Sequence, residues 1–382
     1  MANTLTNLIP DVYAALDTVS RELVGFIPAV TRDSRADMVA ENQTLRSFAT
    51  AANTAAGNIT PAMAFPSAAY QTVGNKSLTI SKQRFAPFSW TGEELYSMDQ
   101  GPGSRAIIQD QIAQAFRALV NEMEVDLAVA AGLGGSRAYG TTAGTAPVLA
   151  DFSNAKKILD DNGAPLDRSV VMDTAAGVAL RNTSNLYKVN EGGDNSLLRQ
   201  GLLGNLYGFN LRESGQVQTP TKGTAASATT DNAGYAVGAT TITLASAGTG
   251  TILAGDIITF AGDTNKYIVA TGDSDVSNGG TIVLQQPGLR VAMSAATKAI
   301  TVFGTSTRNC AFARSAIILA TRLPAIPPGG DIATDRMVVT DPRSGISFMV
   351  SMYPGLKMVT YHVEACWGTL VVKPEHVAQI IG

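Results

Sequence analysis

Apolar residues recur at helical spacing near the start of the chain. Val12, Leu16, Val19 and Leu23 follow Pro10, a residue that the first turn of a helix accepts readily. A glycine and a proline then end the pattern. A single helix of about 15 residues is marginally stable in water, so its apolar stripe needs a partner. That partner is either the same domain or a neighbouring subunit, in which case the segment is an arm.

The clearest helical pattern predicts one long helix over residues 104–131. Ser104 is a suitable capping residue, and glycines follow directly after residue 131. At 1.5 Å per residue such a helix is ~40 Å long. Its apolar face does not keep strict heptads, so we expect a spine within a fold and no coiled coil. The face consists of Ile108, Ile112, Ala115, Phe116, Leu119, Met123, Leu127 and Ala130.

Residues 49–69 have no helical period and are rich in Ala, Thr, Asn and Pro. Strand-like patterns lie on both sides, at residues 45–48 and 76–89. This arrangement predicts a long two-stranded excursion with a loose tip. Because polar loops of this length are uncommon inside compact domains, the pattern favours a tip that another subunit receives.

The rest of the chain predicts two kinds of structure. Residues 151–218 alternate helix and strand, which indicates an α/β domain. A linker-like composition at 219–235 is followed by five or six short segments of period two, which predict a small β-barrel or sandwich. They include 241–245, 256–261, 266–271, 281–285 and 298–303. Because linkers bound this part on both sides, it reads as an insertion. Strands are expected again at 316–320, 337–340, 347–351, 356–363 and 367–372, before a short tail to Gly382.

Composition adds a shortage of charge. Charged residues are 15% of the 382, against roughly 25% in an ordinary soluble chain, whereas the hydrophobic fraction is a normal 45%. This low charged fraction excludes a charge-rich disordered chain and a basic nucleic-acid-binding protein, and the net charge of −3 gives no bulk attraction to DNA or to an anionic membrane. We expect no signal peptide and no membrane span, since no apolar run approaches ~20 residues. Residues 49–69 contain no charged residue at all, which is typical of a contact surface.

Candidate chemistry is nearly absent from the sequence. There is no metal-binding spacing, no nucleophile motif and no phosphate-binding loop. Glycines 101 and 103 are interpreted as a helix-capping turn, and Glu122 and Asp126 as a solvated or inter-subunit face. We therefore nominate no catalytic, cofactor-binding or metal-ligating residue and expect no enzyme. The chain has only two histidines and two cysteines: His362, His376, Cys310 and Cys366.

The order of these segments resembles the major capsid protein of tailed bacteriophages, the α+β Hong Kong 97 fold. The β insertion makes it similar to the coat protein of short-tailed Salmonella-type phages. The resemblance covers essentially the whole chain but has no diagnostic short motif. It implies an N-terminal arm (1–38), an extended E-loop (39–92), a peripheral domain with the spine helix (93–150), an axial domain (151–219), an inserted β-barrel domain (220–307) and the remainder of the axial and peripheral domains (308–382).

The resemblance also implies a function and partners. Copies would self-assemble as hexamers and pentamers into an icosahedral shell around double-stranded DNA, in a virion built in the bacterial cytoplasm. The E-loop would lie across a neighbour's peripheral domain. The arm begins within the first dozen residues, which implies a separate scaffolding protein; a portal protein and non-specific contact with DNA are also implied, with no membrane and no cofactor. Some relatives crosslink a loop lysine, and Lys76 and Lys82 lie in that region, but no acceptor is identified.

Two alternatives remain open at this point. The first is another virion structural protein, such as a tail-tube or decoration protein, which would form rings or tubes and need no long spine helix. The second is a sugar- or nucleotide-processing enzyme with an accessory β domain. The near-empty catalytic inventory argues against the enzyme.

Overall fold

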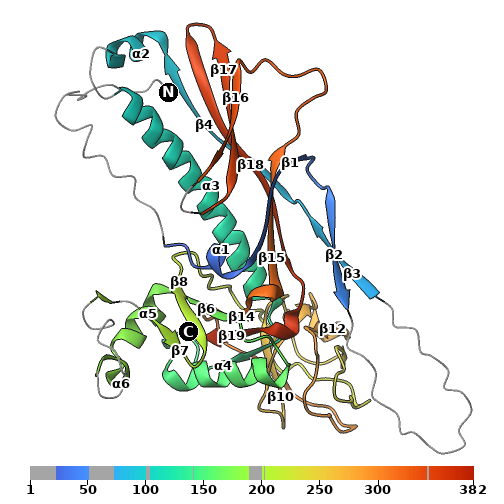
Figure 1. Ribbon diagram of the computed structural model, residues 1–382. Coiled ribbons are helices and arrows are strands. Elements are labelled where there is room, and N and C mark those ends of the chain that lie inside the picture. The colour runs from blue at the N-terminus through green and yellow to red at the C-terminus, as the bar shows by residue number, and fades with distance from the viewer. Residues whose placement is uncertain are drawn as a thin grey trace, which may run out of the picture.

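The computed structural model describes residues 23–50, 73–99, 104–140, 142–188, 200–201, 203–341 and 344–382. The expected N-terminal helix, nearly all of the loop tip at 49–69 and the glycine turn at 101–103 lie outside these ranges. Within them, a long helix and one sheet form the upper part in Figure 1, and a second sheet with its helices forms the lower part.

The predicted spine helix is confirmed as α3 (Ser104–Gly134), 31 residues long. It begins at Ser104 as expected but continues three residues past Ala131. Gly132 remains helical because it is buried, with the Gln379 side-chain amide donating to its carbonyl and the Arg308 side chain against it. The apolar face of α3 packs on the first sheet, where Phe116 stacks on Phe348 with ring centroids 4.8 Å apart. A shorter helix, α2 (Gly92–Asp99), precedes it.

The first sheet has the order β1-β15-β18-β17-β16, with β4 on the other edge of β18. The prediction of separate strands at 356–363 and 367–372 is wrong, because one 14-residue strand runs through both. This strand, β18, pairs along one edge first with β17 and then with β15. Along its other edge β4 pairs across the point where the partner changes, a point that includes the buried Ala365 and Trp367, and β18 therefore stays continuous. β1 was not predicted. The strands are β1 (Thr31–Val39), β15 (Ile317–Pro324), β18 (Met358–Val371), β17 (Ser347–Gly355), β16 (Asp335–Thr340) and β4 (Lys82–Thr91).

The second sheet confirms the α/β character expected for residues 151–218. Asp173 caps α5 (Thr174–Arg181), its carboxylate accepting from the Ala176 backbone N–H at 2.9 Å. The expected short tail is instead a fully buried central strand, β19, between β5 and β14. Both its faces are covered, so it lacks the alternation by which strands are recognised. The elements are β5 (Arg137–Tyr139), α4 (Leu149–Asp161), β6 (Arg168–Met172), α5 (Thr174–Arg181), α6 (Ser184–Tyr187), β7 (Asn205–Leu206), β8 (Phe209–Glu213), β14 (Arg308–Ala313) and β19 (Val377–Ile381).

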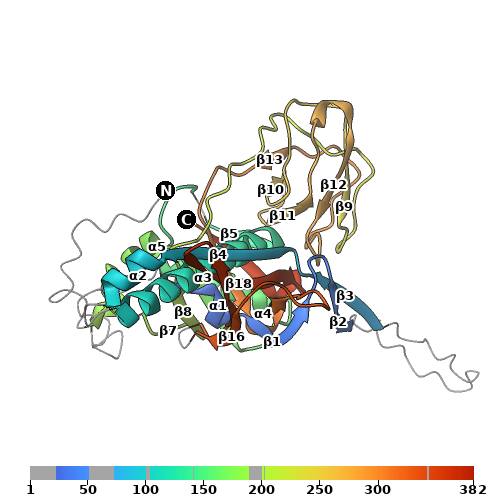
Figure 2. The ribbon, with the colours of Figure 1, turned by 90° about the horizontal axis from the view of Figure 1, so that it is seen from above.

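All five segments expected as strands between residues 241 and 303 form strands. They surround their own hydrophobic cluster, which includes Ile242, Ile258 and Ile282. Figure 2 shows them standing off one face of the rest of the chain. Pairing of β11 with β5 joins them to the second sheet. The strands are β9 (Thr241–Leu244), β10 (Ile257–Phe260), β11 (Lys266–Thr271), β12 (Gly280–Leu284) and β13 (Ile300–Val302).

The two-stranded excursion is present as a projecting antiparallel pair, β2 (Thr44–Thr50) and β3 (Val73–Thr79) (Figure 1). The expected second flank at 76–89 divides in two, because the chain turns at Ile80 and continues as β4. Ile80 is buried and exchanges backbone hydrogen bonds with Asn42 and Gln43, which holds the root of the pair. No helix in the described ranges is long and apolar enough to cross a membrane.

Candidate functional surfaces

Ion pairs hold β4, the strand that follows the projecting pair, against α3. Lys82 Nζ lies 3.1 Å from Glu122 and 2.8 Å from Asp126, and Arg84 Nε lies 3.1 Å from Glu122. Trp367 donates from Nε1 to Asp126 at 2.7 Å. The interpretation of Glu122 and Asp126 as a solvated or inter-subunit face is therefore wrong, since they face β4 and β18 of their own chain. Partial burial would lower the pKa of Lys82, but the two carboxylates outweigh it and the pKa is raised.

The far end of β4 is also tied to α3. Trp90 donates from Nε1 to the Gln111 side-chain oxygen at 2.6 Å. Next to it, the backbone N–H of Thr91 donates to Glu94 at the start of α2 at 2.8 Å. Both ends of β4 are thus held on one helix, so the projecting pair leaves the body from a rigid base.

A buried carboxylate anchors the chain where the described residues begin. Glu124 of α3 is fully buried and accepts hydrogen bonds from the backbone N–H groups of Gly25 (2.6 Å), Phe26 (2.7 Å) and Ile27 (3.0 Å), and from the Ser214 hydroxyl (2.8 Å). It supplies the N-terminal acceptor for the short helix α1 (Phe26–Ala29). Sequence reasoning missed this residue, although a signal existed: a carboxylate next to Met123 lies on the apolar side of the spine.

His376 and both cysteines are buried, and His362 packs against aromatic rings of neighbouring strands. His362 lies between the rings of Phe85 and Tyr353, each 4.9 Å away, with Nδ1 3.5 Å from Glu364. Burial lowers the pKa of His376, and burial raises the pKa of each cysteine thiol to about 12. A thiol with that pKa stays protonated near neutrality and is a poor nucleophile. In the described ranges, no three potential metal-ligating side chains come together.

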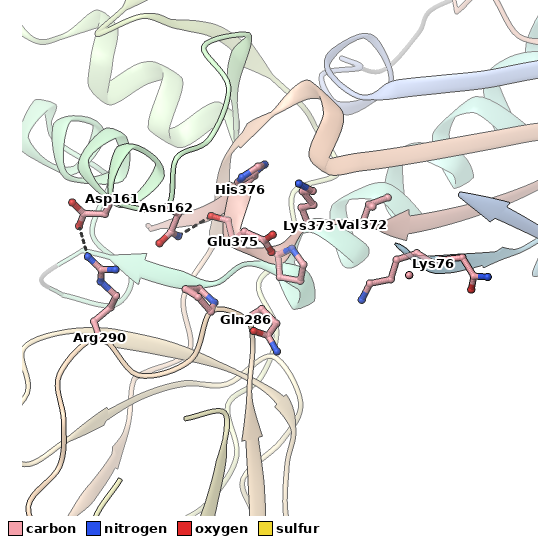
Figure 3. Close-up of a pocket in the computed structure, with 13 residues that line it drawn as sticks. Lys76, Asp161, Asn162, Gln286, Arg290, Val372, Lys373, Glu375 and His376 are labelled. Atoms are coloured by element: carbon pink, nitrogen blue, oxygen red, sulfur yellow. Dashed lines mark hydrogen bonds and ion pairs between the residues drawn. The ribbon is translucent and has the colours of Figure 1, made fainter. Parts of the chain in front are cut away.

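A recess of about 810 Å³ separates the projecting pair from the body (Figure 3). Four segments line it: β3, the end of α4, the loop after β12, and residues 372–376. Within it, the Asn162 amide donates to the Glu375 backbone oxygen at 2.7 Å, and Arg290 lies 4.0 Å from Asp161. Asp161 also pairs with Lys157 at 3.1 Å. The lining carries side chains of both charges, and no nucleophile with an adjacent base lies in it.

Charge is distributed unevenly between the projecting pair and the helices that follow. Residues 42–91 contain four basic side chains, among them Arg46 and Lys76, and no carboxylate. Residues 92–126 contain seven carboxylates and two arginines. Opposite charges on different patches of one chain suit head-to-tail contact between copies.

Two solved structures have a similar fold over nearly their whole length. One is described as "Mycobacterium phage Che8", with a TM-score of 0.52 and 16% identity, covering 99% of this chain and 98% of the other. The second, "Capsid structure of the Cyanophage P-SCSP1u", has a TM-score of 0.53 and 10% identity, covering 100% and 95%. No family profile matches the sequence, nor does any curated protein. The likeness shows a common fold, and the expected α+β architecture of the Hong Kong 97 type is confirmed to that extent.

Proposed function

We propose that this chain is a major capsid protein, which self-assembles into the icosahedral shell that encloses the double-stranded DNA genome of a tailed bacteriophage. The observation that carries the proposal is the fold, shared over essentially the full chain with a structure described as a cyanophage capsid. Copies meet as hexamers and pentamers, and the mature location is the virion. The function of the chain is then contact between copies, which agrees with its low charged fraction.

The uneven charge supports a particular mode of contact. Lys82 and Arg84 are neutralised within the chain by Glu122 and Asp126, whereas Arg46 and Lys76, on the projecting pair, have no ion-pair partner among the residues that the structure describes. We infer that this pair is the E-loop and lies across the peripheral domain of a neighbour, where Glu93 of α2 and Asp110 of α3 are carboxylates that neither Lys82 nor Arg84 engages. A heterologous contact of this kind closes into a ring when the rotation between copies allows it.

The proposal includes the domain boundaries given above and the partners implied by the resemblance. A separate scaffolding protein and a portal protein would direct assembly, and contacts with packaged DNA would be non-specific. The net charge of −3 agrees with the absence of a strongly basic DNA-binding surface.

We also propose that residues 220–307 are a β-barrel domain inserted into the fold, as in the short-tailed Salmonella-type coat proteins. Support comes from the two connections, which run side by side: the Thr219 and Thr307 hydroxyls are 3.0 Å apart, and the Lys222 backbone N–H donates to the Thr305 hydroxyl at 3.3 Å. Adjacent ends and a separate hydrophobic cluster are what an insertion requires.

A fragment of residues 219–307 should therefore fold by itself. We expect it to show a β-type circular dichroism spectrum and a single cooperative melting transition.

Tyr267→Phe tests the core of this fragment, because the Tyr267 hydroxyl donates to Asp263 at 2.6 Å and accepts from the Arg290 backbone N–H at 3.0 Å. We expect the free energy of unfolding of this variant to be lower by about 1 kcal/mol, and its melting temperature to be lower accordingly. A fragment without a cooperative transition would contradict the insertion.

The function itself is tested by assembly. Purified full-length protein, alone and with the scaffolding protein of its phage, should give capsomers or megadalton particles in size-exclusion chromatography and closed shells in negative-stain micrographs. Rings or tubes would indicate a different virion component. A compact monomer that never assembles, even with scaffold, would overturn the proposal.

A further inference from the structure

Two unpaired side chains of opposite charge lie on opposite walls of the recess. Lys76 belongs to β3 of the projecting pair, and Glu375 belongs to the segment between β18 and β19. In Figure 3 the Lys76 side chain extends from β3 toward the body, the side on which Glu375 lies. In the part of the chain that the structure describes, neither the Lys76 ammonium nor the Glu375 carboxylate has an ion pair or hydrogen bond.

The other charges of the recess leave Glu375 as its free carboxylate. Asp161 is engaged by Lys157 at 3.1 Å, Arg137 at 3.5 Å and Arg290 at 4.0 Å. Lys373, two residues before Glu375, makes no ion pair with it. Lys76 is therefore the cation of the projecting pair that can approach Glu375 from across the recess.

The two walls differ in how firmly they are held. Behind Glu375, His376 is buried and the Glu375 backbone oxygen accepts from Asn162, so this wall belongs to the core. On the other side, β2 and β3 pair with each other and with no other strand of the described residues. Leu78 is buried near the root, but residues 74–77 are all exposed. The outer part of the pair can therefore pivot about its root without breaking a sheet or uncovering the core.

We propose that the projecting pair closes onto the body of its own chain, and that Lys76 and Glu375 form an ion pair across the recess in the closed form. The structure shows the open form. Because ion pairs between exposed groups stabilise only weakly, the closed form is easily reversed. If the chain is a shell protein, which is a separate proposal, closure would withhold the pair from a neighbouring copy before assembly.

Carbodiimide crosslinking of the full-length monomer tests this contact directly, because the reagent joins an amine to a carboxylate only when the two touch. We expect a Lys76–Glu375 crosslink in the peptide mass spectrum, lost in Glu375→Gln. Lys82 is an internal control, since it already touches Glu122 and Asp126. In a mixture of ¹⁴N and ¹⁵N chains the product must be of one isotope. Lys82 products without the Lys76 product, or mixed-isotope Lys76 products, would overturn the proposal.

Spin labels measure the closure without chemistry at the contact itself. Ser77→Cys and Leu166→Cys place labels on the pair and on the body, and both native cysteines are buried, which leaves them unlabelled. We expect two distances in the parent, only the longer one after Lys76→Glu, and return of the shorter one when Lys76→Glu is combined with Glu375→Lys. A single distance that neither change affects would overturn the closure. None of these measurements requires a shell, so their failure leaves the proposed function standing.

Discussion

Replacing residues 51–72 by an Asn-Gly turn is expected to leave a folded chain that no longer forms shells. Thr50 and Val73 are paired across β2 and β3, so a two-residue turn can join them without changing the register. The removed segment has no charged residue, as expected of a surface that a neighbour covers. We expect a melting temperature within a few degrees of the parent, together with the loss of particles in sedimentation and micrographs.

A second variant separates the length of this segment from its sequence. Residues 51–72 replaced by a Gly/Ser chain of equal length should also fold and should also fail to assemble, because it offers no apolar contact. Shells of ordinary size from both variants would show that the segment is not an assembly contact. Unfolding of both would instead show that the segment belongs to the core of its own chain.

Glu124→Ala is expected to have the largest effect of any single substitution on α3. It leaves three backbone N–H groups, at Gly25, Phe26 and Ile27, without their acceptor in a buried site. Each unsatisfied buried group costs roughly 1–3 kcal/mol. We expect the free energy of unfolding to fall by about 3 kcal/mol or more, measured by denaturant titration. The free energy of unfolding of Glu124→Gln should lie between those of the parent and of Glu124→Ala, since the amide oxygen of glutamine can still accept a hydrogen bond.

Glu122→Ala is the matched control, two residues earlier on the same helix. The Glu122 side chain is 33% exposed, and Lys82 keeps its contact with Asp126 when Glu122 is removed. Exposed ion pairs contribute about 0.2–1 kcal/mol, so the loss should stay below about 1 kcal/mol. If Glu122→Ala lowered the free energy of unfolding as much as Glu124→Ala, the hydrogen bonds of the buried Glu124 carboxylate would have no special role in stability.

The elements that the sequence predicted well are those with a strong local period. The spine helix has eight apolar residues on one face between Ile108 and Ala130, and it begins at Ser104 as expected. The strands between residues 241 and 303 alternate because one face covers their own cluster. These patterns arise from neighbours along the chain, so no knowledge of the fold is needed to recognise them.

The elements that were missed or divided lack such a period. β1 carries Arg32, Asp33, Arg35 and Asp37 at a sheet edge, which hides its strand character. β19 is apolar on both faces and resembles a short tail. One edge of β18 pairs first with β17 and then with β15. The hydrophobic pattern of the sequence therefore changes partway along β18, although the strand itself continues. In each case, strands distant in sequence determine which faces are covered.

The sequence by itself determined the order of segments, the long spine, the two-stranded excursion and the shortage of charge. From these, the fold class could be predicted. The tertiary structure decided which charges meet: that Glu122 and Asp126 hold β4, that Glu124 is buried beneath Gly25, and that Lys76 and Glu375 lie across one recess. The physical reason is distance along the chain. Periodicity reports burial by local geometry, whereas an ion pair or a buried carboxylate depends on segments that only the complete fold brings together.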